Sequence, residues 1–114
     1  MANRDKRLAL SIRQPYAEQI LRGVKTIEYR SRRTRIRDRV YVYASMKGAA
    51  ACEFEALGVS PTSLPTGRIV GSVEIVACKR VGASTYHWLL AEPRRLSRPR
   101  RPTGKPQPVW FYPW

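Results

Sequence analysis

The strongest constraint on the fold is a two-residue alternation of apolar and polar or small side chains, seen in residues 8–13 and again in residues 25–30. This period is typical of a half-buried β-strand. Residues 68–78 are the best strand candidate, and Gly71 inside them predicts a bulge or the close approach of another backbone. Further segments with strand character are residues 40–45 and 109–112, and residues 86–90 fit either a strand or a helix, with their aromatic residues favouring a strand.

Two segments depart from this alternation and favour short helices. In residues 14–23, Pro15 suits a first helical position and Gly23 suits a left-handed stop. Residues 49–57, closed by Gly58, predict a second short helix. The connections are too short for repeated parallel crossovers. We therefore expect an α+β fold, a curled sheet or small barrel of about five or six strands with two short helices.

Chain length and composition favour one domain. The chain has 114 residues, of which 43% are apolar, enough for one core. We expect a basic tail over residues 1–7 and a single domain over residues 8–114. No apolar run reaches about 18 residues, and residues 1–5 lack the apolar core of a signal peptide. The prediction is a soluble, cytoplasmic protein without a membrane partner.

Cysteines and glycine motifs give no support for a metal or cofactor. Cys52 and Cys78 have neither CxxC spacing nor a neighbouring histidine cluster. We expect both thiols to be reduced and buried. Walker-type and GxGxxG patterns are absent, so we predict no metal and no cofactor.

The charge of the chain indicates a polyanionic partner. Its formal net charge is +14, from 22 basic and 8 acidic residues, and 17 of the basic residues are arginine. The guanidinium fork pairs bidentately with phosphate and stacks on bases. We expect a nucleic acid, with RNA or DNA and single strand or duplex left open; the alternative is a basic surface that serves only solubility.

Two basic segments are candidates for phosphate contacts. The first is the segment that follows residue 30. Its arginines at every second position, from Arg33 to Arg39, would line one face of an extended chain and contact phosphates. The second, residues 93–106, contains several prolines and no acid, and we expect an ordered or half-ordered loop within the domain. Tyr16 is the best candidate for stacking on a base, ahead of Trp88 and Trp110. The predicted nucleic-acid-binding residues are Tyr16, Lys25, Glu28, Arg30, Arg32, Arg33, Arg35, Arg37, Arg39, Arg94, Arg95, Arg98, Arg100 and Arg101.

A smaller group of residues suggests a pocket. Glu28 and Arg30 are two apart on a predicted strand and share a face, and Lys25 can join them from the turn after Gly23. A carboxylate between two cations could hold a base edge, a ribose hydroxyl or a phosphate. The alternative is a surface ion pair, worth at most about 1 kcal/mol. The lone His87 is expected to be a packed strand residue rather than a general base.

Several motifs in order resemble the activating signal cointegrator homology (ASCH) domain. Its usual signature, a Q-P-W/Y helix start and then G-x-K-x-x-E-x-R, matches Gln14-Pro15-Tyr16 followed by Gly23, Lys25, Glu28 and Arg30. The stretches LPTGRIVGSVEIVAC, YHWLLAEPRRL and GKPQPVW resemble later parts of the family. The resemblance extends from about residue 8 to residue 110.

This resemblance implies a PUA-like β-barrel with a cleft beside the first helix, and a role in nucleic-acid binding, in RNA metabolism or transcription regulation. A distant bacterial branch hydrolyses N4-acetylcytidine, and some members are reported as ribonucleases. In that branch the catalytic threonine corresponds to Glu28 here. The leading hypothesis is a nucleic-acid-binding domain; the alternative is a hydrolase of RNA or a modified nucleoside with Lys25 and Glu28 as the reactive pair. A weaker alternative is recruitment of acidic proteins.

Overall fold

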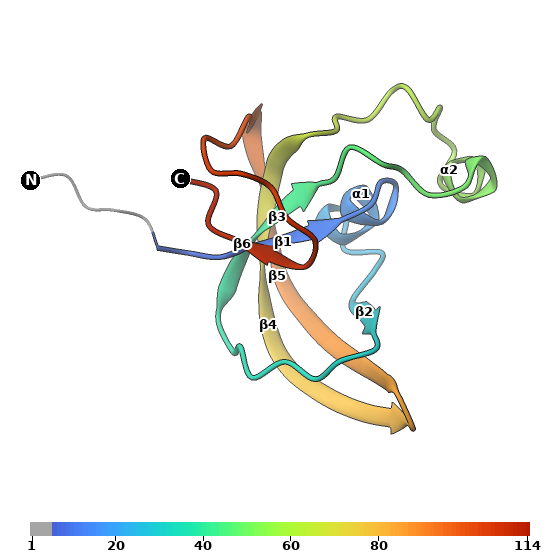
Figure 1. The fold of residues 1–114 in the computed structure, drawn as a ribbon. Coiled ribbons are helices and arrows are strands. Elements are labelled where there is room, and N and C mark those ends of the chain that lie inside the picture. The colour runs from blue at the N-terminus through green and yellow to red at the C-terminus, as the bar shows by residue number, and fades with distance from the viewer. Residues whose placement is uncertain (1–5) are drawn as a thin grey trace, which may run out of the picture.

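The computed structural model describes residues 6–114 and has an α+β fold built on one mixed sheet. The six strands lie in the order β2-β5-β4-β3-β1-β6, and two short helices lie outside the sheet (Figure 1). The predicted α+β class, strand number and two helices are confirmed. The elements are β1 (Ala9–Ile12), α1 (Tyr16–Leu21), β2 (Ile27–Arg30), β3 (Arg39–Ala44), α2 (Ala51–Leu57), β4 (Arg68–Gly82), β5 (Thr85–Arg100) and β6 (Trp110–Phe111).

The β4–β5 hairpin is the longest feature of the sheet and arches across the molecule (Figure 1). The prediction that residues 93–106 form a loop is wrong as far as Arg100, because β5 continues through Pro93 and Pro99. β2 pairs only with residues 86–89, so the later part of β5 has no β2 neighbour. Proline is tolerated there, since an edge strand does not need every N–H. Register shifts in the β4–β5 ladder show that this part is bulged.

The sheet curls so that side chains link each edge strand to the strand beside the opposite edge. In the described residues β2 and β6 are the edges and do not pair with each other. The ring of Trp88 on β5 stacks on Trp110 of β6, with centroids 5.8 Å apart. Arg30 of β2 donates from Nη2 to the Ser11 carbonyl oxygen of β1 over 3.0 Å. The barrel-like shape therefore depends on these bridges rather than on a continuous backbone ladder.

Helix α1 packs against the concave sheet and completes the larger core. Ala17 and Ile20 of α1 are buried with Leu10, Val42 and Val73 of the strands. Gly71 of β4 permits this packing, because a Cβ there would collide with the Arg94 carbonyl oxygen and with the Leu21 side chain. The predicted close approach at Gly71 is confirmed.

The two cysteines are less buried than predicted. Cys52 is exposed and Cys78 is only partly buried, so the expectation of two buried thiols is wrong for Cys52. The reason is that α2 buries only Phe54 and leaves most of its surface in solvent.

Of the predicted basic tail, Lys6 and Arg7 are exposed, and residues 1–5 lie outside the described residues. Within residues 6–114 no helix is both long and apolar enough to cross a bilayer.

Candidate functional site

A cleft of about 1100 Å³ opens where the two sheet edges approach each other. Its walls come from the end of β1, from α1, from β2, from residues 43–47 and from residues 106–109 before β6. Of the predicted site residues, Tyr16, Lys25, Glu28 and Arg30 line this cleft. The structure thus brings together the four residues that the sequence motif singled out.

Helix α1 places two of these side chains. Tyr16 opens the helix, and the helix ends before Gly23, which has a left-handed φ of +75° as predicted. The carbonyl oxygen of Gln19 then accepts from the backbone N–H groups of Val24 and Lys25, at 2.9 and 3.1 Å. Tyr16 and Lys25 are therefore held at the two ends of one short helix.

Glu28 forms the charged floor of the cleft. It is 8% exposed, and its Oε2 accepts from Nε of Arg30 over 2.7 Å. Lys25 Nζ lies 3.6 Å from Oε1 of the same carboxylate. At this distance the two groups form an ion pair, but the contact is too long for a hydrogen bond. Oε1 consequently keeps capacity to accept a hydrogen bond from a bound molecule.

Two tyrosines flank the Lys25 ammonium. Its Nζ lies 5.6 Å from the Tyr16 ring centroid and 4.6 Å from that of Tyr29, both within the range of cation–π attraction. Burial raises the pKa of the Tyr16 hydroxyl, and the Glu53 carboxylate raises it further. The Tyr16 side chain therefore stays neutral at physiological pH.

The rim of the cleft is apolar. Val24, Tyr29, Met46 and Val109 line it and are the rim's exposed large side chains, at 69%, 60%, 75% and 38% of their surface. A polar floor inside an apolar rim is typical of sites that take ligands with both a flat apolar surface and polar edges.

Other residues of the cleft were not predicted. Arg13, Lys47 and the hydroxyl-bearing Ser11 and Ser45 line it, together with residues 106–109. These residues belong to segments far apart in sequence, which meet only because β1 lies between β3 and β6. Nothing in their local pattern distinguishes them.

The first arginine segment lies outside the cleft. Arg32, Arg33, Arg35 and Arg37 are exposed, and Thr34 between them is buried, as the predicted alternation requires. The alternation predicts Arg39 on the same exposed face as Arg33, Arg35 and Arg37. It is instead only partly exposed, because it donates to Ser72 Oγ and to the Glu92 carbonyl oxygen, at 2.9 and 2.8 Å. Burial lowers the pKa of the Arg39 guanidinium, and nearby Arg94 lowers it further.

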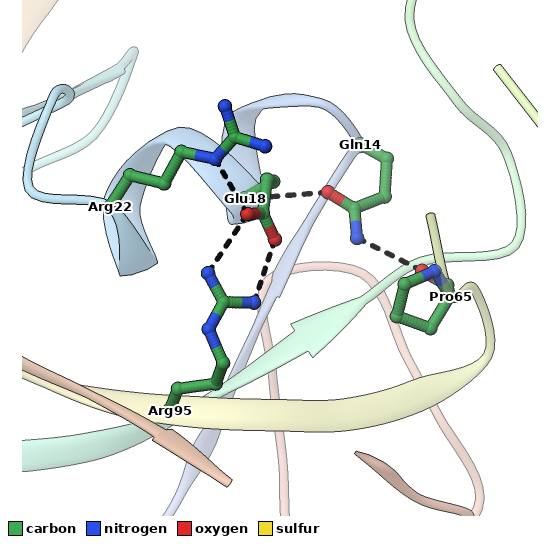
Figure 2. Close-up of polar contacts among 5 residues, drawn as sticks. All are labelled: Gln14, Glu18, Arg22, Pro65 and Arg95. Carbon is green, nitrogen blue, oxygen red and sulfur yellow. Dashed lines mark hydrogen bonds and ion pairs between the residues drawn. The ribbon is translucent and has the colours of Figure 1, made fainter. Parts of the chain in front are cut away.

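In the second segment, Arg95 has an internal partner. Its Nη1 and Nη2 donate to Oε1 and Oε2 of Glu18 on α1, each over 2.8 Å, while Arg22 donates to Oε2 from Nε (Figure 2). The hydrogen bonds from Arg95 hold the pKa of Glu18 below its usual value despite burial. In the same view the Gln14 side chain accepts from the Glu18 backbone N–H and donates to the Pro65 carbonyl oxygen. Arg95 therefore ties α1 to β5.

The remaining candidates are divided between surface and core. Arg94, Arg98, Arg100 and Arg101 are exposed, and Arg100 lies 4.0 Å over the Trp114 ring. Trp88 is only 2% exposed and donates from Nε1 to the Arg32 carbonyl oxygen, so it packs in the core and has no surface on which a base could stack. His87 packs edge-on against Tyr29, consistent with the predicted packing role.

A profile of the ASCH domain matches residues 10–111. The chain belongs to the ASCH domain family. Among solved structures, ASCH from Zymomonas mobilis is similar at 16% identity and a TM-score of 0.57, over 84% of this chain and 73% of that one. Two variants of that protein are also similar. One carries phenylalanine for tyrosine, at 15% identity and a TM-score of 0.58, over 85% of this chain and 76% of that one.

The other carries alanine for serine, at 16% identity and a TM-score of 0.53, over 84% of this chain and 74% of that one. At these identities the likeness establishes the shared fold. No curated protein sequence matches the chain. The sequence-level resemblance to an ASCH domain is thus confirmed.

Proposed function

We propose that this ASCH domain binds RNA and holds one unstacked nucleotide in the cleft. The observation that carries the proposal is the buried Glu28 carboxylate, held by Arg30 and approached by Lys25, on the floor of a cleft with an apolar rim. RNA recognition commonly uses splayed bases that stack on aromatic side chains while their edges are hydrogen-bonded.

The floor presents both acceptors and donors to a base edge. Glu28 Oε1 accepts only, and Lys25 Nζ donates only. Side by side at 3.6 Å they match a base edge that places a donor next to an acceptor. Tyr16 and Tyr29 supply the aromatic surfaces on which such a base would stack.

The surface charge supplies the affinity for the backbone. The net charge of +14 attracts a polyanion over the whole surface. Arg32, Arg33, Arg98 and Arg101 are exposed and suited to phosphate contacts. We therefore assign nucleotide selection to the cleft and sequence-independent attraction to these arginines.

Binding of fluorescent single-stranded and duplex RNA and DNA over a series of salt concentrations tests the proposal. We expect single-stranded RNA to bind most tightly, with an affinity that falls steeply as salt rises. Competition by a matched DNA strand measures the preference for the ribose hydroxyl. Undetectable binding of every nucleic acid at low salt would refute the proposal.

A hydrolase is the second candidate, favoured by the Lys25–Glu28 pair lying inside the cleft rather than on an open surface. Glu28 would act as the base that activates water and Lys25 would stabilise the developing negative charge. Incubation with RNA and with N4-acetylcytidine tests this role. Turnover that is lost in the Lys25→Ala and Glu28→Ala variants would support it, and turnover that persists in the double variant would exclude these residues.

A further inference from the structure

A second hollow, which we call the basic hollow, lies at the opposite end of β1 from the cleft. It has a volume of about 780 Å³, and its basic lining residues are Lys6, Arg7, Arg35, Arg37 and Arg39. Among residues 6–114, Asp38 is the one acidic residue that lines it, and that carboxylate accepts from the Arg39 backbone N–H over 2.7 Å. The hollow is thus strongly cationic, and the Asp38 carboxylate is partly satisfied by the backbone.

The edge of the sheet connects the two sites. The cleft contains Ser11 of β1 and Val109 before β6, whereas the basic hollow contains Leu8 before β1 and Tyr112 after β6. β1 and β6 pair through Ala9 with Phe111 and Leu10 with Trp110, so this short ladder separates the two sites. From Leu8 to Ser11 the chain advances about 10 Å at about 3.3 Å per strand residue.

An exposed apolar or aromatic side chain lies at each end of this edge. Val109 at the cleft end is 38% exposed and Tyr112 at the hollow end is 58% exposed. An exposed tyrosine beside a cationic hollow is the combination used to bind single-stranded nucleic acid, with the ring stacking on a base and the cations pairing with phosphate.

Resting on the proposed function, we propose that a single RNA strand leaves the cleft, runs along the β6 edge over Tyr112, and places a later phosphate in the basic hollow. Stacked nucleotides are about 3.4 Å apart along one strand, so a separation of about 10 Å corresponds to roughly three nucleotides between the two sites. The domain then binds a strand at two points and has a minimum length for full affinity.

Arg35 is the best residue for testing the hollow. It lines the hollow and is exposed. Arg37 is less suitable because it donates to the Thr34 and Ile36 carbonyl oxygens and so orders its own segment. Lys79, exposed on the β4–β5 hairpin and lining neither site, provides a control with the same change of charge.

The test measures binding of three-nucleotide and twelve-nucleotide single-stranded RNAs to the wild type, Arg35→Glu, Tyr112→Ala and Lys79→Glu proteins. We expect Arg35→Glu and Tyr112→Ala each to weaken the twelve-mer about tenfold and to change the trimer less than about twofold. Lys79→Glu should change both RNAs by the same small factor.

Equal effects of Arg35→Glu and Lys79→Glu on the twelve-mer would overturn the basic hollow as a site. Equal wild-type affinities for the two RNAs would also overturn it while leaving the cleft intact. Failure of the wild type to bind either RNA at low salt would instead refute the proposed function itself. Circular dichroism melting of each variant checks that the fold is retained.

Discussion

Two buried glutamates, Glu18 and Glu28, have nearly the same local chemistry but serve different ends. Each carboxylate is mostly buried and each lies between two cations, Arg22 and Arg95 for the first, Lys25 and Arg30 for the second. Glu18 accepts three hydrogen bonds, one from Arg22 and two from Arg95, which use both of its oxygens within the protein. At Glu28, which lines the cleft, Oε1 is approached within the described residues by Lys25, whose Nζ lies 3.6 Å away and does not form a hydrogen bond.

The difference shows that a charge pattern does not by itself mark a binding site. Glu18 joins α1 to β5, which positions the helix that bears Tyr16 (Figure 2). Glu28 uses a similar pair of cations to hold an acceptor at the surface of a cavity. We expect the first carboxylate to govern stability alone, whereas the second governs binding and, because its cations Lys25 and Arg30 are less exposed, also contributes to stability.

The largest expected effect is on stability at Glu18. Glu18→Gln removes the charge that neutralises Arg95 and Arg22, whose side chains are 50% and 41% exposed. Loss of a partner in a fully buried pair costs about 3–5 kcal/mol, and the partial exposure of these arginines reduces our estimate to about 2 kcal/mol. Urea denaturation measures this change, and RNA affinity should stay within about twofold where the variant is folded.

Arg22→Ala serves as the control for Glu18, because it removes one cation and leaves the bidentate Arg95 pair. We expect a loss below about 1 kcal/mol. A loss at Arg22 as large as that at Glu18 would mean that the helix surface, rather than the link to β5, provides the stability.

The next largest effect is on binding at Glu28. Glu28→Gln replaces one accepting carboxylate by an amide, and we expect RNA affinity to fall about tenfold, or about 1.4 kcal/mol. Fluorescence anisotropy measures the affinity. The matched control is Glu55→Gln on the exposed face of α2, which changes the same charge and should leave affinity within about twofold. If Glu28→Gln and Glu55→Gln bound RNA with similar affinity, Glu28 would have no special role in binding, and the distinction between Glu18 and Glu28 would be removed.

Acid should weaken the protein through Glu18. Its pKa is lowered in the folded state, chiefly by the hydrogen bonds from Arg95. The resulting stability is fully present above the ordinary glutamate pKa of about 4.3 and is lost as the pH falls through the lowered folded value. Urea midpoints of the wild type and Glu18→Gln measured from pH 7 to pH 3 should converge at the acid end. A constant difference across that range would contradict the assignment.

The smallest effect is expected at Arg33, an exposed arginine that has no structural partner within residues 6–114. Arg33→Ala should leave stability within about 0.5 kcal/mol. It should weaken RNA and reduce the slope of log affinity against log salt by about 0.7, the value for one single-strand phosphate contact. An unchanged slope would show that Arg33 does not contact phosphate.

The sequence predicted those parts of the site that depend on local geometry. Alternation placed Glu28 and Arg30 on one face, and Gly23 predicted the turn that brings Lys25 to them. The role of Arg95 could not be predicted, because its partner Glu18 lies 77 positions away. The proline-containing end of β5 was mistaken for a loop because no local signal distinguishes an edge strand from a loop.

The most direct test of a nucleotide in the Glu28 cleft is an NMR titration of the isotopically labelled protein with a twelve-nucleotide single-stranded RNA. We expect the largest backbone amide shifts at Tyr16, Lys25 and Glu28, with smaller shifts in residues 32–39, and we expect Glu28→Gln to diminish the cleft shifts selectively. Shifts confined to the arginine segments, with the three cleft amides unchanged, would show that the protein binds RNA by charge alone.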